Sequence, residues 1–407
     1  MCQRFTLFLK KWCNIKNLKI KDVLFNKIIL FLNFLIIFLS TCYINIPIIS
    51  KFLFILSMIL SSILIVLYTL NFKFNCFSIL YFMFLFLLFL ASFISDSASI
   101  LLFFKNFLKI SAVALYLNWG INVNYKNTIN SIYYALYVMI MINFATIIIF
   151  PTGMYSGSYN NNWFLGYDNT HIFWFVSAIA MGVVKKKLIH NNNFQSILFV
   201  LLLLIISYSV LFCFSANSVI GYIIIIIYLL FFKFLKNKKY LNSKNYFIVT
   251  FMTFFSIVIF RVQNVFSWLI VGILKKDLTF TNRTTVWDNA IKWIIKKPLL
   301  GSGIESNEIV ISKLNGVHFV HAHDTYLDVL YKGGILSMIP FLLLIFFASK
   351  KLYEYKDYNV IKVLSIILFS CLIMMIFESR EFSFGLYIIL VLAFNCDILI
   401  KSGEKNE

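Results

Sequence analysis

Three histidines, His318, His321 and His323, fall within six positions in the segment H-F-V-H-A-H-D. They belong to a polar stretch, residues 283–337, in an otherwise apolar chain, and Arg283 stands at its head. Histidine exchanges protons near neutral pH, and arginine pairs in bidentate fashion with phosphate oxygens. The residue types therefore predict proton transfer beside a phosphate-bearing group.

A helix is predicted to begin near Asp324 or Thr325, because apolar residues repeat at helical spacing from Tyr326 onwards. Either residue can cap this helix, and Asp328 is placed to complete a T-x-x-D capping box. His323 would lie just before the positive end of the helix dipole, which disfavours imidazolium and keeps the ring available as a base. The same helix end can receive a phosphate oxygen.

Three roles compete for the histidines: base, metal ligand and structural residue. Asp324 and His318 lie near the H-A-H segment, but H-x-H spacing alone is a weak metal signal, so we expect no metal. We interpret His323 as functional, rank His321 second and expect His318 to be structural. The G-S-G turn at Gly301 and Gly303 lacks the lysine of a P-loop and predicts no nucleotide site.

The composition predicts an integral membrane protein. Hydrophobic residues make up 61% of the 407 residues and charged residues only 13%, whereas soluble domains carry about 25% charged residues. The apolar runs approach the roughly 20 residues that a membrane-spanning helix needs, and they lack the alternation of a barrel. The seven cysteines are scattered, which predicts neither a disulfide framework nor a zinc site.

We expect an all-α fold of about twelve transmembrane helices. The predicted spans are roughly 28–46, 51–70, 77–95, 99–118, 129–150, 170–184, 194–214, 217–235, 246–263, 330–349, 360–377 and 382–400. The resulting domains are a basic cytoplasmic tail (1–27), nine helices (28–263), a large outer loop (264–329), three helices (330–400) and a cytoplasmic tail (401–407).

The net charge of +20 follows this topology. Lysines concentrate in the loops that a cytoplasmic N-terminus places inside, while the short outer loops around Asp96, residues 151–168 and Ser215 carry no Lys or Arg. This is the positive-inside bias of membrane proteins, so the charge predicts no nucleic-acid partner.

Two outer loops and one pair of lysines are candidates for substrate contacts. Residues 151–169 are rich in Gly, Asn, Ser and aromatic residues, which is typical both of sugar sites and of ordinary surface loops. The larger loop contains an amphipathic segment from Val286 to Ile294, which predicts a helix at the outer membrane interface, anchored by Trp287 and Trp293. Lys105 and Lys109 lie four positions apart in the fourth span, either at a lipid phosphate or snorkelling towards the interface.

The order of these motifs resembles the O-antigen polymerase and ligase superfamily of bacterial membrane enzymes. R-x-x-x-W at Arg283 and Trp287 precedes P-L-L-G-S-G, and H-A-H-D-x-x-L then leads to G-G-I-L-S. His323, Asp324 and Gly334 fit the family's spacing of a histidine, a small polar residue and a later glycine, although the family usually has Asn at the second position. The resemblance covers about residues 150–390.

The resemblance implies a metal-independent, glycosyltransferase-C-like enzyme without a cofactor. Such enzymes move a glycan from undecaprenyl pyrophosphate to an acceptor at the outer face of the inner membrane. It implies that His323 positions or deprotonates the acceptor hydroxyl and that Arg283 neutralises the pyrophosphate leaving group. Further substrate contacts are expected from His321, Asp324, Glu305, Asn169, Lys105, Arg261 and Arg380. Structural roles are expected for Trp287, Gly301, Gly303 and Gly334.

Within this family we favour a repeat-unit polymerase for a capsule, exopolysaccharide or O-antigen, because Ala216 stands where ligases often have arginine. The alternatives are a ligase, which moves finished glycan to a lipid core or protein, and a flippase. A transporter would concentrate polar residues at the membrane midplane. The expected partners are the bilayer, the lipid-linked oligosaccharide, a chain-length regulator and a repeat-unit flippase. Both termini are expected in the bacterial cytoplasm.

Overall fold

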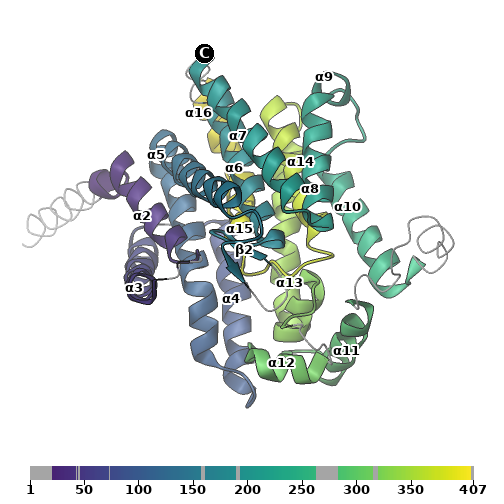
Figure 1. Ribbon diagram of the computed structural model, residues 1–407. Coiled ribbons are helices and arrows are strands. Elements are labelled where there is room, and N and C mark those ends of the chain that lie inside the picture. The colour runs from purple at the N-terminus through teal and green to yellow at the C-terminus, as the bar shows by residue number, and fades with distance from the viewer. Residues whose placement is uncertain are drawn as a thin grey trace, which may run out of the picture. The chain divides into compact units, whose positions relative to one another are not determined.

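The computed structural model describes residues 21–404 except 43, 45, 73, 157–160, 189–192, 263–282 and 315–319. Almost all of its regular structure is helical (Figure 1), in agreement with an all-α membrane protein. The helices are α2 (Lys27–Leu39), α3 (Pro47–Asn71), α4 (Cys76–Ile94), α5 (Ile100–Ile149), α6 (Asp168–Leu188), α7 (Asn193–Phe212), α8 (Ala216–Leu230), α9 (Phe232–Leu235), α10 (Ser243–Phe254), η1 (Phe255–Ile259), α11 (Arg283–Lys296), α12 (Asn307–Leu314), α13 (Thr325–Glu354), α14 (Asn359–Met374), α15 (Phe384–Phe394) and α16 (Cys396–Glu404).

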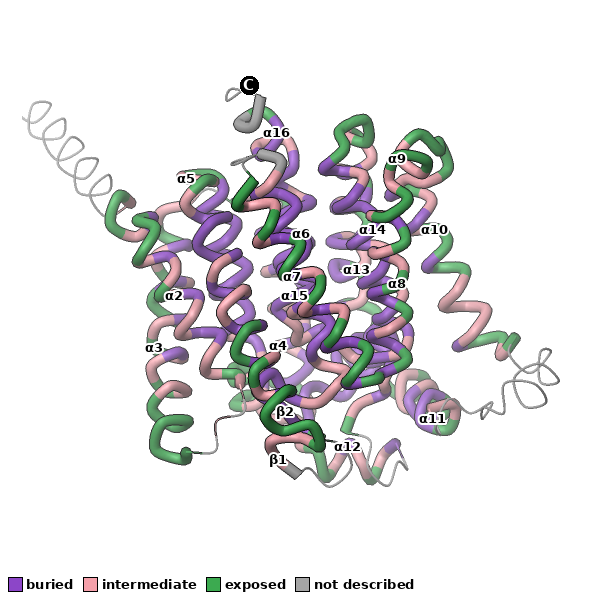
Figure 2. The backbone as a smooth tube through the Cα atoms, turned by 45° about the horizontal axis from the view of Figure 1, so that its top comes forward, coloured by how far each residue is buried: buried purple, intermediate pink, exposed green. Residues whose placement is uncertain are grey.

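Five of the described helices are long and apolar enough to cross a membrane: α3, α4, α5, α7 and α13. Figure 2 shows how much of α3 is exposed, and its exposed side chains include Ile48, Phe52 and Ile55. Apolar side chains on the outside of a helix are stable beside lipid and costly beside water. The described helices therefore support a multi-pass membrane protein, while the count of twelve spans stays a prediction.

Helix α5 contains two of the predicted spans. Asn124 interrupts it with φ −149° and ψ 80°. The Asn124 side chain accepts a hydrogen bond from the N–H of Asn127 at 3.1 Å and so begins the second half in the manner of a cap. The two halves correspond to the spans predicted at 99–118 and 129–150.

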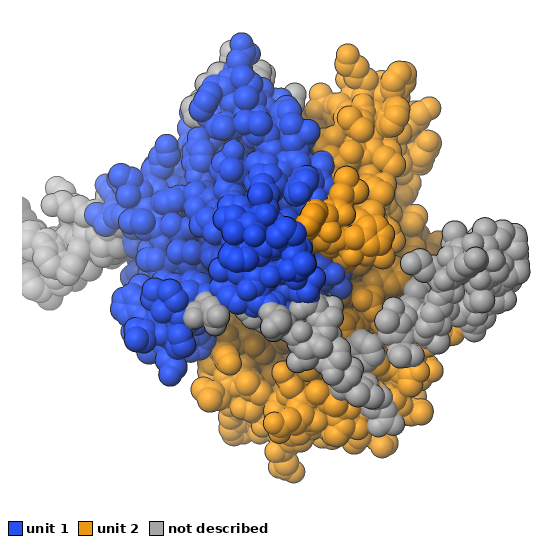
Figure 3. Space-filling model, viewed as in Figure 1, with its two compact units in different colours: residues 1–73, 111–209, 397–407 blue, residues 74–110, 210–396 orange. Residues whose placement is uncertain are grey.

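The chain forms two compact units (Figure 3). The first contains residues 1–73, 111–209 and 397–407, and the second contains residues 74–110 and 210–396. Asn169 belongs to the first unit. Every other candidate residue belongs to the second.

The first unit contains a small sheet within residues 151–169, the loop predicted to lie outside. Its strands are β1 (Tyr155–Ser156), β2 (Asn161–Trp163) and β3 (Gly166–Tyr167), which pair antiparallel in the order β1-β2-β3. Strands of two or three residues are too short to show alternation, so sequence reasoning missed them. Asn169 follows β3 as the second residue of α6, where its N–H donates to Asp168 Oδ1 at 2.7 Å.

In the second unit, α13 packs along α4 and is broken at Gly334, where φ is 62° and ψ is −169°. The loop at 298–303 fills this break. Its N–H groups donate to the carbonyls of Tyr331 and Lys332 at 2.7 and 2.8 Å, and its carbonyls accept from the two residues after Gly334 at 2.8 and 3.2 Å. The backbone groups freed by the break are thus satisfied within the protein, as is required of a helix that is long and apolar enough to cross a membrane.

The glycines of both segments permit this close approach. Gly301 and Gly303 also have positive φ, 67° and 74°. A Cβ atom at Gly334 would lie 2.2 Å from the carbonyl oxygen of Leu299, and one at Gly301 would lie 2.6 Å from that of Tyr331. Side chains at these positions would collide with backbone, which cannot move aside as a flexible side chain can.

Helices α11 and α12 lie beside each other in the predicted outer loop, and α11 also contacts α13 (Figure 1). The predicted amphipathic helix is present and ends before Pro298. The expected role of Trp287 as a membrane anchor is wrong, because its side chain is fully buried in the protein under the guanidinium of Arg261. The ammonium groups of Lys296 and Lys313 lie 4.2 and 4.4 Å from the ring centroid of Trp293.

Gly334→Ala is expected to lower the free energy of unfolding by about 3 kcal/mol, because the new Cβ meets the Leu299 carbonyl at a strained φ. Thermal unfolding of the purified protein in detergent measures the change. Ile335→Ala, which truncates an exposed side chain beside the break, is the control and should change stability little. Equal melting temperatures for Gly334→Ala and wild type would contradict this account of the break.

Candidate active site

The histidine segment leads directly into α13, whose start was predicted correctly. Asp324 is the N-cap, and its Oδ1 accepts a hydrogen bond from the N–H of Leu327 at 2.8 Å. The capping box predicted between Thr325 and Asp328 does not form. Thr325 instead donates its hydroxyl to the carbonyl of Glu378 at 2.7 Å. Burial raises the pKa of the Asp324 carboxyl well above its ordinary value, which favours the neutral acid.

His323 has a left-handed backbone, with φ of 51°. Such a conformation is uncommon for a residue with a side chain, and strain of this kind gathers at functional sites. The turn brings the His323 and His321 rings to 4.1 Å between centroids and places His323 Nδ1 3.3 Å from Glu378 Oε1. His318 lies outside the described residues.

Glu378 is the centre of this arrangement, and sequence reasoning missed it. Its side chain is completely buried. Arg283 Nη2 lies 3.7 Å from Oε2, while Arg380 Nη2 and His321 Nε2 lie 3.9 and 3.8 Å from Oε1. The structure thus brings together four of the predicted residues, Arg283, His321, His323 and Arg380, around one carboxylate.

The protonation states follow from this setting. Burial favours the protonated form of Glu378, but Arg380 and His323 outweigh burial and hold the pKa of its carboxyl well below the ordinary value. Burial, with a smaller effect of the neighbouring His323, lowers the pKa of His321 to about 3. At neutral pH, Glu378 is therefore an anion and His321 is a neutral ring.

A second buried group of charges fixes the two loops that form the centre. Asp328 Oδ1 accepts the N–H of Ala322 at 3.1 Å, and Oδ2 accepts the hydroxyl of Ser379. Lys332 Nζ lies 3.5 Å from Asp328 Oδ1 and also donates to Glu381. Asp328 therefore joins the loop before α13, which carries the histidines, to the loop after α14, which carries Glu378.

His321, His323 and Glu378 are also a possible ligand set, since one donor atom from each lies within 4.8 Å of the others. The positive charge of the two neighbouring arginines argues against a metal ion at these three residues. Arg283 and Arg380 already compensate the carboxylate, and a divalent cation would be placed beside two guanidinium groups. The same charges are suited to an anion such as pyrophosphate.

The remaining candidates occupy other places. Arg261 packs against α11, where its Nη2 lies 2.7 Å from Asp288 Oδ1. The buried Glu305 carboxylate receives Lys313 Nζ at 2.5 Å, the hydroxyl of Tyr331 at 2.6 Å and the hydroxyl of Ser97. Glu305 thereby joins the loop before α12 to α13, which is a structural use of its oxygens. Lys105 is exposed on α5.

One signal in the sequence points to Glu378. The segment E-S-R-E at 378–381 is a short polar run between two apolar spans. Ionisable residues at membrane depth mark a functional site by default, and this run directly follows the predicted span 360–377. Arg380 was selected from this run, but no sequence pattern joins Glu378 to His323.

Glu378 and the four residues around it are called the polar centre below. Because His321 belongs to it, the free energy of unfolding of the protein is expected to fall by up to about 2 kcal/mol as the pH falls from about 7 to about 5. The folded protein holds the pKa of His321 near 3, below the ordinary value of about 6.5, so the unfolded chain binds the proton first. This contribution is present above about pH 6.5 and is lost as the pH falls towards 3. Thermal unfolding at both pH values tests it, with His321→Gln as the comparison. Parallel pH dependence in the two proteins would refute the assignment.

Comparison with known proteins agrees with the resemblance found in the sequence. The family model described as O-Antigen ligase matches residues 199–342. The matched region includes Arg283, both described histidines and the break in α13, while Glu378 and Arg380 lie beyond it. No curated protein matches the chain.

Proposed function

We propose, from the O-antigen ligase domain that the chain carries at residues 199–342, that this protein polymerises lipid-linked repeat units of a bacterial surface polysaccharide. The donor is a glycan on undecaprenyl pyrophosphate, and the acceptor is a hydroxyl of another lipid-linked unit. The observation that supports this most is the buried Glu378 carboxylate, with His323 and two arginines around it. This centre combines a base with cations for a leaving anion.

His323 would accept the proton of the acceptor. Its Nδ1 faces Glu378 Oε1 at 3.3 Å, which favours the tautomer with the proton on Nδ1 and the lone pair on Nε2. The acceptor oxygen forms a bond to the anomeric carbon of the donor while its proton passes to Nε2. Glu378 stabilises the resulting imidazolium, as a buried carboxylate does in other histidine-dependent sites.

Arg283 and Arg380 would stabilise the leaving group. As the new bond forms, the bond between the anomeric carbon and the pyrophosphate oxygen breaks, and negative charge stays on the lipid pyrophosphate. Each arginine approaches Glu378 through Nη2 at 3.7 or 3.9 Å. A guanidinium has five N–H donors in a fork that matches phosphate oxygens, so the same groups can stabilise the developing charge.

The proposed orientation places this centre at the outer face of the cytoplasmic membrane. The lysine-rich loops would be inside with both termini, and residues 264–329 would form the large outer loop. The substrate contact proposed for His321 is compatible with its place beside His323. The Asp324 side chain is completely buried as the cap of α13, so no substrate contact is proposed for it. A chain-length regulator and a flippase are the proposed protein partners.

His323→Ala and Glu378→Gln are each expected to reduce polymer formation at least about 100-fold, the range for loss of a general base and its partner. Immunoblotting and gel electrophoresis of the polysaccharide measure protein level and polymer in a complemented deletion strain. Glu308→Gln, at an exposed glutamate of α12, is the matched control. Polymer of wild-type amount and length from His323→Ala at normal protein level would refute the proposal.

A ligase is the second candidate, and the description of the matched family favours it. The lipid-linked pool of a deletion strain separates the two functions. Loss of a polymerase should leave single lipid-linked repeats, whereas loss of a ligase should leave long lipid-linked chains. Accumulated long chains would transfer the assignment from polymerase to ligase.

Transfer by the purified enzyme is expected to continue after treatment with a metal chelator, because Arg283 and Arg380 supply the positive charge at the leaving group. The rate of glycan transfer before and after exhaustive chelation is the measurement. A rate that falls about tenfold or more and returns on addition of one divalent metal would instead assign His321, His323 and Glu378 as its ligands.

A further inference from the structure

A pocket of about 310 Å³ lies in the second unit, where the end of α4 adjoins the loop that follows α11. Its lining comes from Ala91, Ile94 and Ser95 of the first segment and from residues 297–301 of the second. Ser95 and Lys297 are the polar side chains of this lining, and the other side chains are apolar. Lys297 Nζ donates to Ser95 Oγ at 3.4 Å, so the two polar groups lie together.

Lys297 supplies a positive charge that the protein does not neutralise within the described residues. Its side chain is exposed, and it forms no ion pair there, whereas Lys313 is paired with the buried Glu305. Asp96, the acid next to Ser95 in sequence, is exposed and does not line the pocket. An ammonium group has three N–H donors, and its strongest hydrogen bonds are to anionic oxygens. The pocket is therefore suited to an anion.

The pocket lies at the depth of a lipid head group if α4 crosses the membrane. Helix α4 is long and apolar enough to do so, and its 19 residues extend over about 28 Å, close to the thickness of the hydrocarbon core. Ser95 directly follows this helix. Ile94 and Leu299 line the pocket and are 60% and 62% exposed, and apolar side chains so exposed are stable beside acyl chains.

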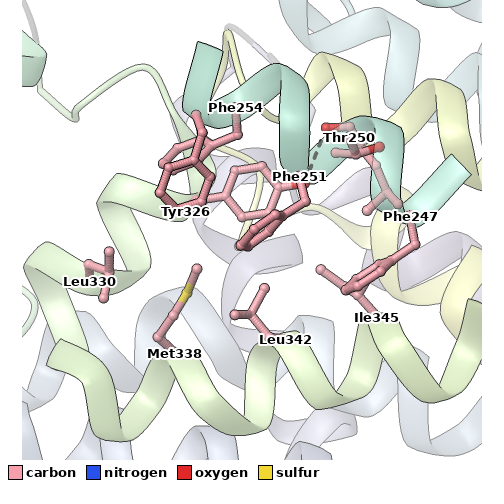
Figure 4. A pocket seen from close by; sticks show the side chains of 11 residues that line it. Phe247, Thr250, Phe251, Phe254, Tyr326, Leu330, Met338, Leu342 and Ile345 are labelled. Atoms are coloured by element: carbon pink, nitrogen blue, oxygen red, sulfur yellow. Dashed lines mark hydrogen bonds between the residues drawn. The ribbon is translucent and has the colours of Figure 1, made fainter. Parts of the chain in front are cut away.

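The apolar slot between α10 and α13 does not combine these features. Figure 4 shows Thr250 and Tyr326, whose hydroxyls both belong to its lining. Both hydroxyls already donate to backbone carbonyls, at 2.9 and 3.2 Å. The described residues that line the slot thus offer a ligand neither a cation nor a free donor, and the slot carries no inference.

We propose that the pocket at Lys297 binds the phosphate of an anionic phospholipid, through the Lys297 ammonium and the Ser95 hydroxyl, with an acyl chain against Ile94 and Leu299. None of the lining residues is acidic, and the neighbouring Lys296 is also exposed. These charges favour a head group such as phosphatidylglycerol over one that carries its own ammonium. The inference is independent of glycan transfer at the polar centre.

The pocket is connected to the break in α13 through its own backbone. The carbonyls of Pro298 and Leu299 accept the hydrogen bonds from the two residues after Gly334, and the N–H of Gly301 donates to the carbonyl of Lys297 at 3.0 Å. A lipid bound here contacts the loop that pairs with α13. Since a ligand that binds only the folded state stabilises it, phosphatidylglycerol should raise the melting temperature of the protein.

Lys297→Gln tests the site, because it removes the ammonium and keeps most of the length of the side chain. The matched control is Lys296→Gln, which removes a neighbouring exposed ammonium that does not line the pocket. Leu299→Glu is a second variant, which brings a carboxylate to an exposed position of the lining.

The probes are phosphatidylglycerol, phosphatidylethanolamine, a diacylglycerol with the same chains, and glycerol phosphate. Native mass spectrometry of the purified full chain measures their binding. Thermal unfolding in detergent, with and without phosphatidylglycerol, measures the stabilisation.

Wild type and Lys296→Gln are expected to bind phosphatidylglycerol about tenfold more tightly than Lys297→Gln or Leu299→Glu, the effect of one charge-assisted hydrogen bond. The other three probes should bind wild type more weakly, and the rise in melting temperature should be smaller in Lys297→Gln. Equal binding of phosphatidylglycerol by Lys297→Gln and wild type would overturn the proposal. Equal binding of diacylglycerol would remove the phosphate from it, and equal binding of glycerol phosphate would replace the lipid by a soluble phosphate ester.

Discussion

A buried negative charge at Glu378 is the constraint on which the rest of the second unit depends. A carboxylate without water is costly unless cations and hydrogen-bond donors surround it. Here Arg283 comes from the start of α11, the histidines precede α13, and Arg380 follows Glu378 in the loop after α14. Three separate segments must therefore converge for the charge to be stable. Their convergence assembles the candidate active site.

The second group of buried charges, around Asp328 and Lys332, holds the converging loops in one geometry. Asp328 joins the histidine loop to Ser379, and Lys332 compensates both Asp328 and Glu381. A buried polar network holds a single geometry when each member has its partners, and it is costly when one is missing. Such a network suits a site in which the orientation of His323 relative to Glu378 decides which ring nitrogen carries the proton.

Backbone hydrogen bonding also limits how the segments of the second unit can be placed. The break in α13 at Gly334 would leave unpaired carbonyl and N–H groups, and the loop at 298–303 pairs with them on both sides. The loop follows α11, whose first residue is Arg283. The same hydrogen bonds that repair α13 therefore limit where α11 can lie, and they connect a glycine-rich motif to the placement of a catalytic candidate.

The sequence by itself determined the features that depend on local composition and spacing. These are the apolar helices, the start of α13 at Asp324, the end of α11 before Pro298 and the prominence of His321 and His323. Hydrophobic periodicity cannot distinguish a membrane from a protein interior, so Trp287 was wrongly placed at the interface. Only the tertiary structure decided the role of Glu378. Its loop meets the start of α13 across 53 residues of sequence, because buried charges choose partners by proximity in space and leave no periodic trace in the chain.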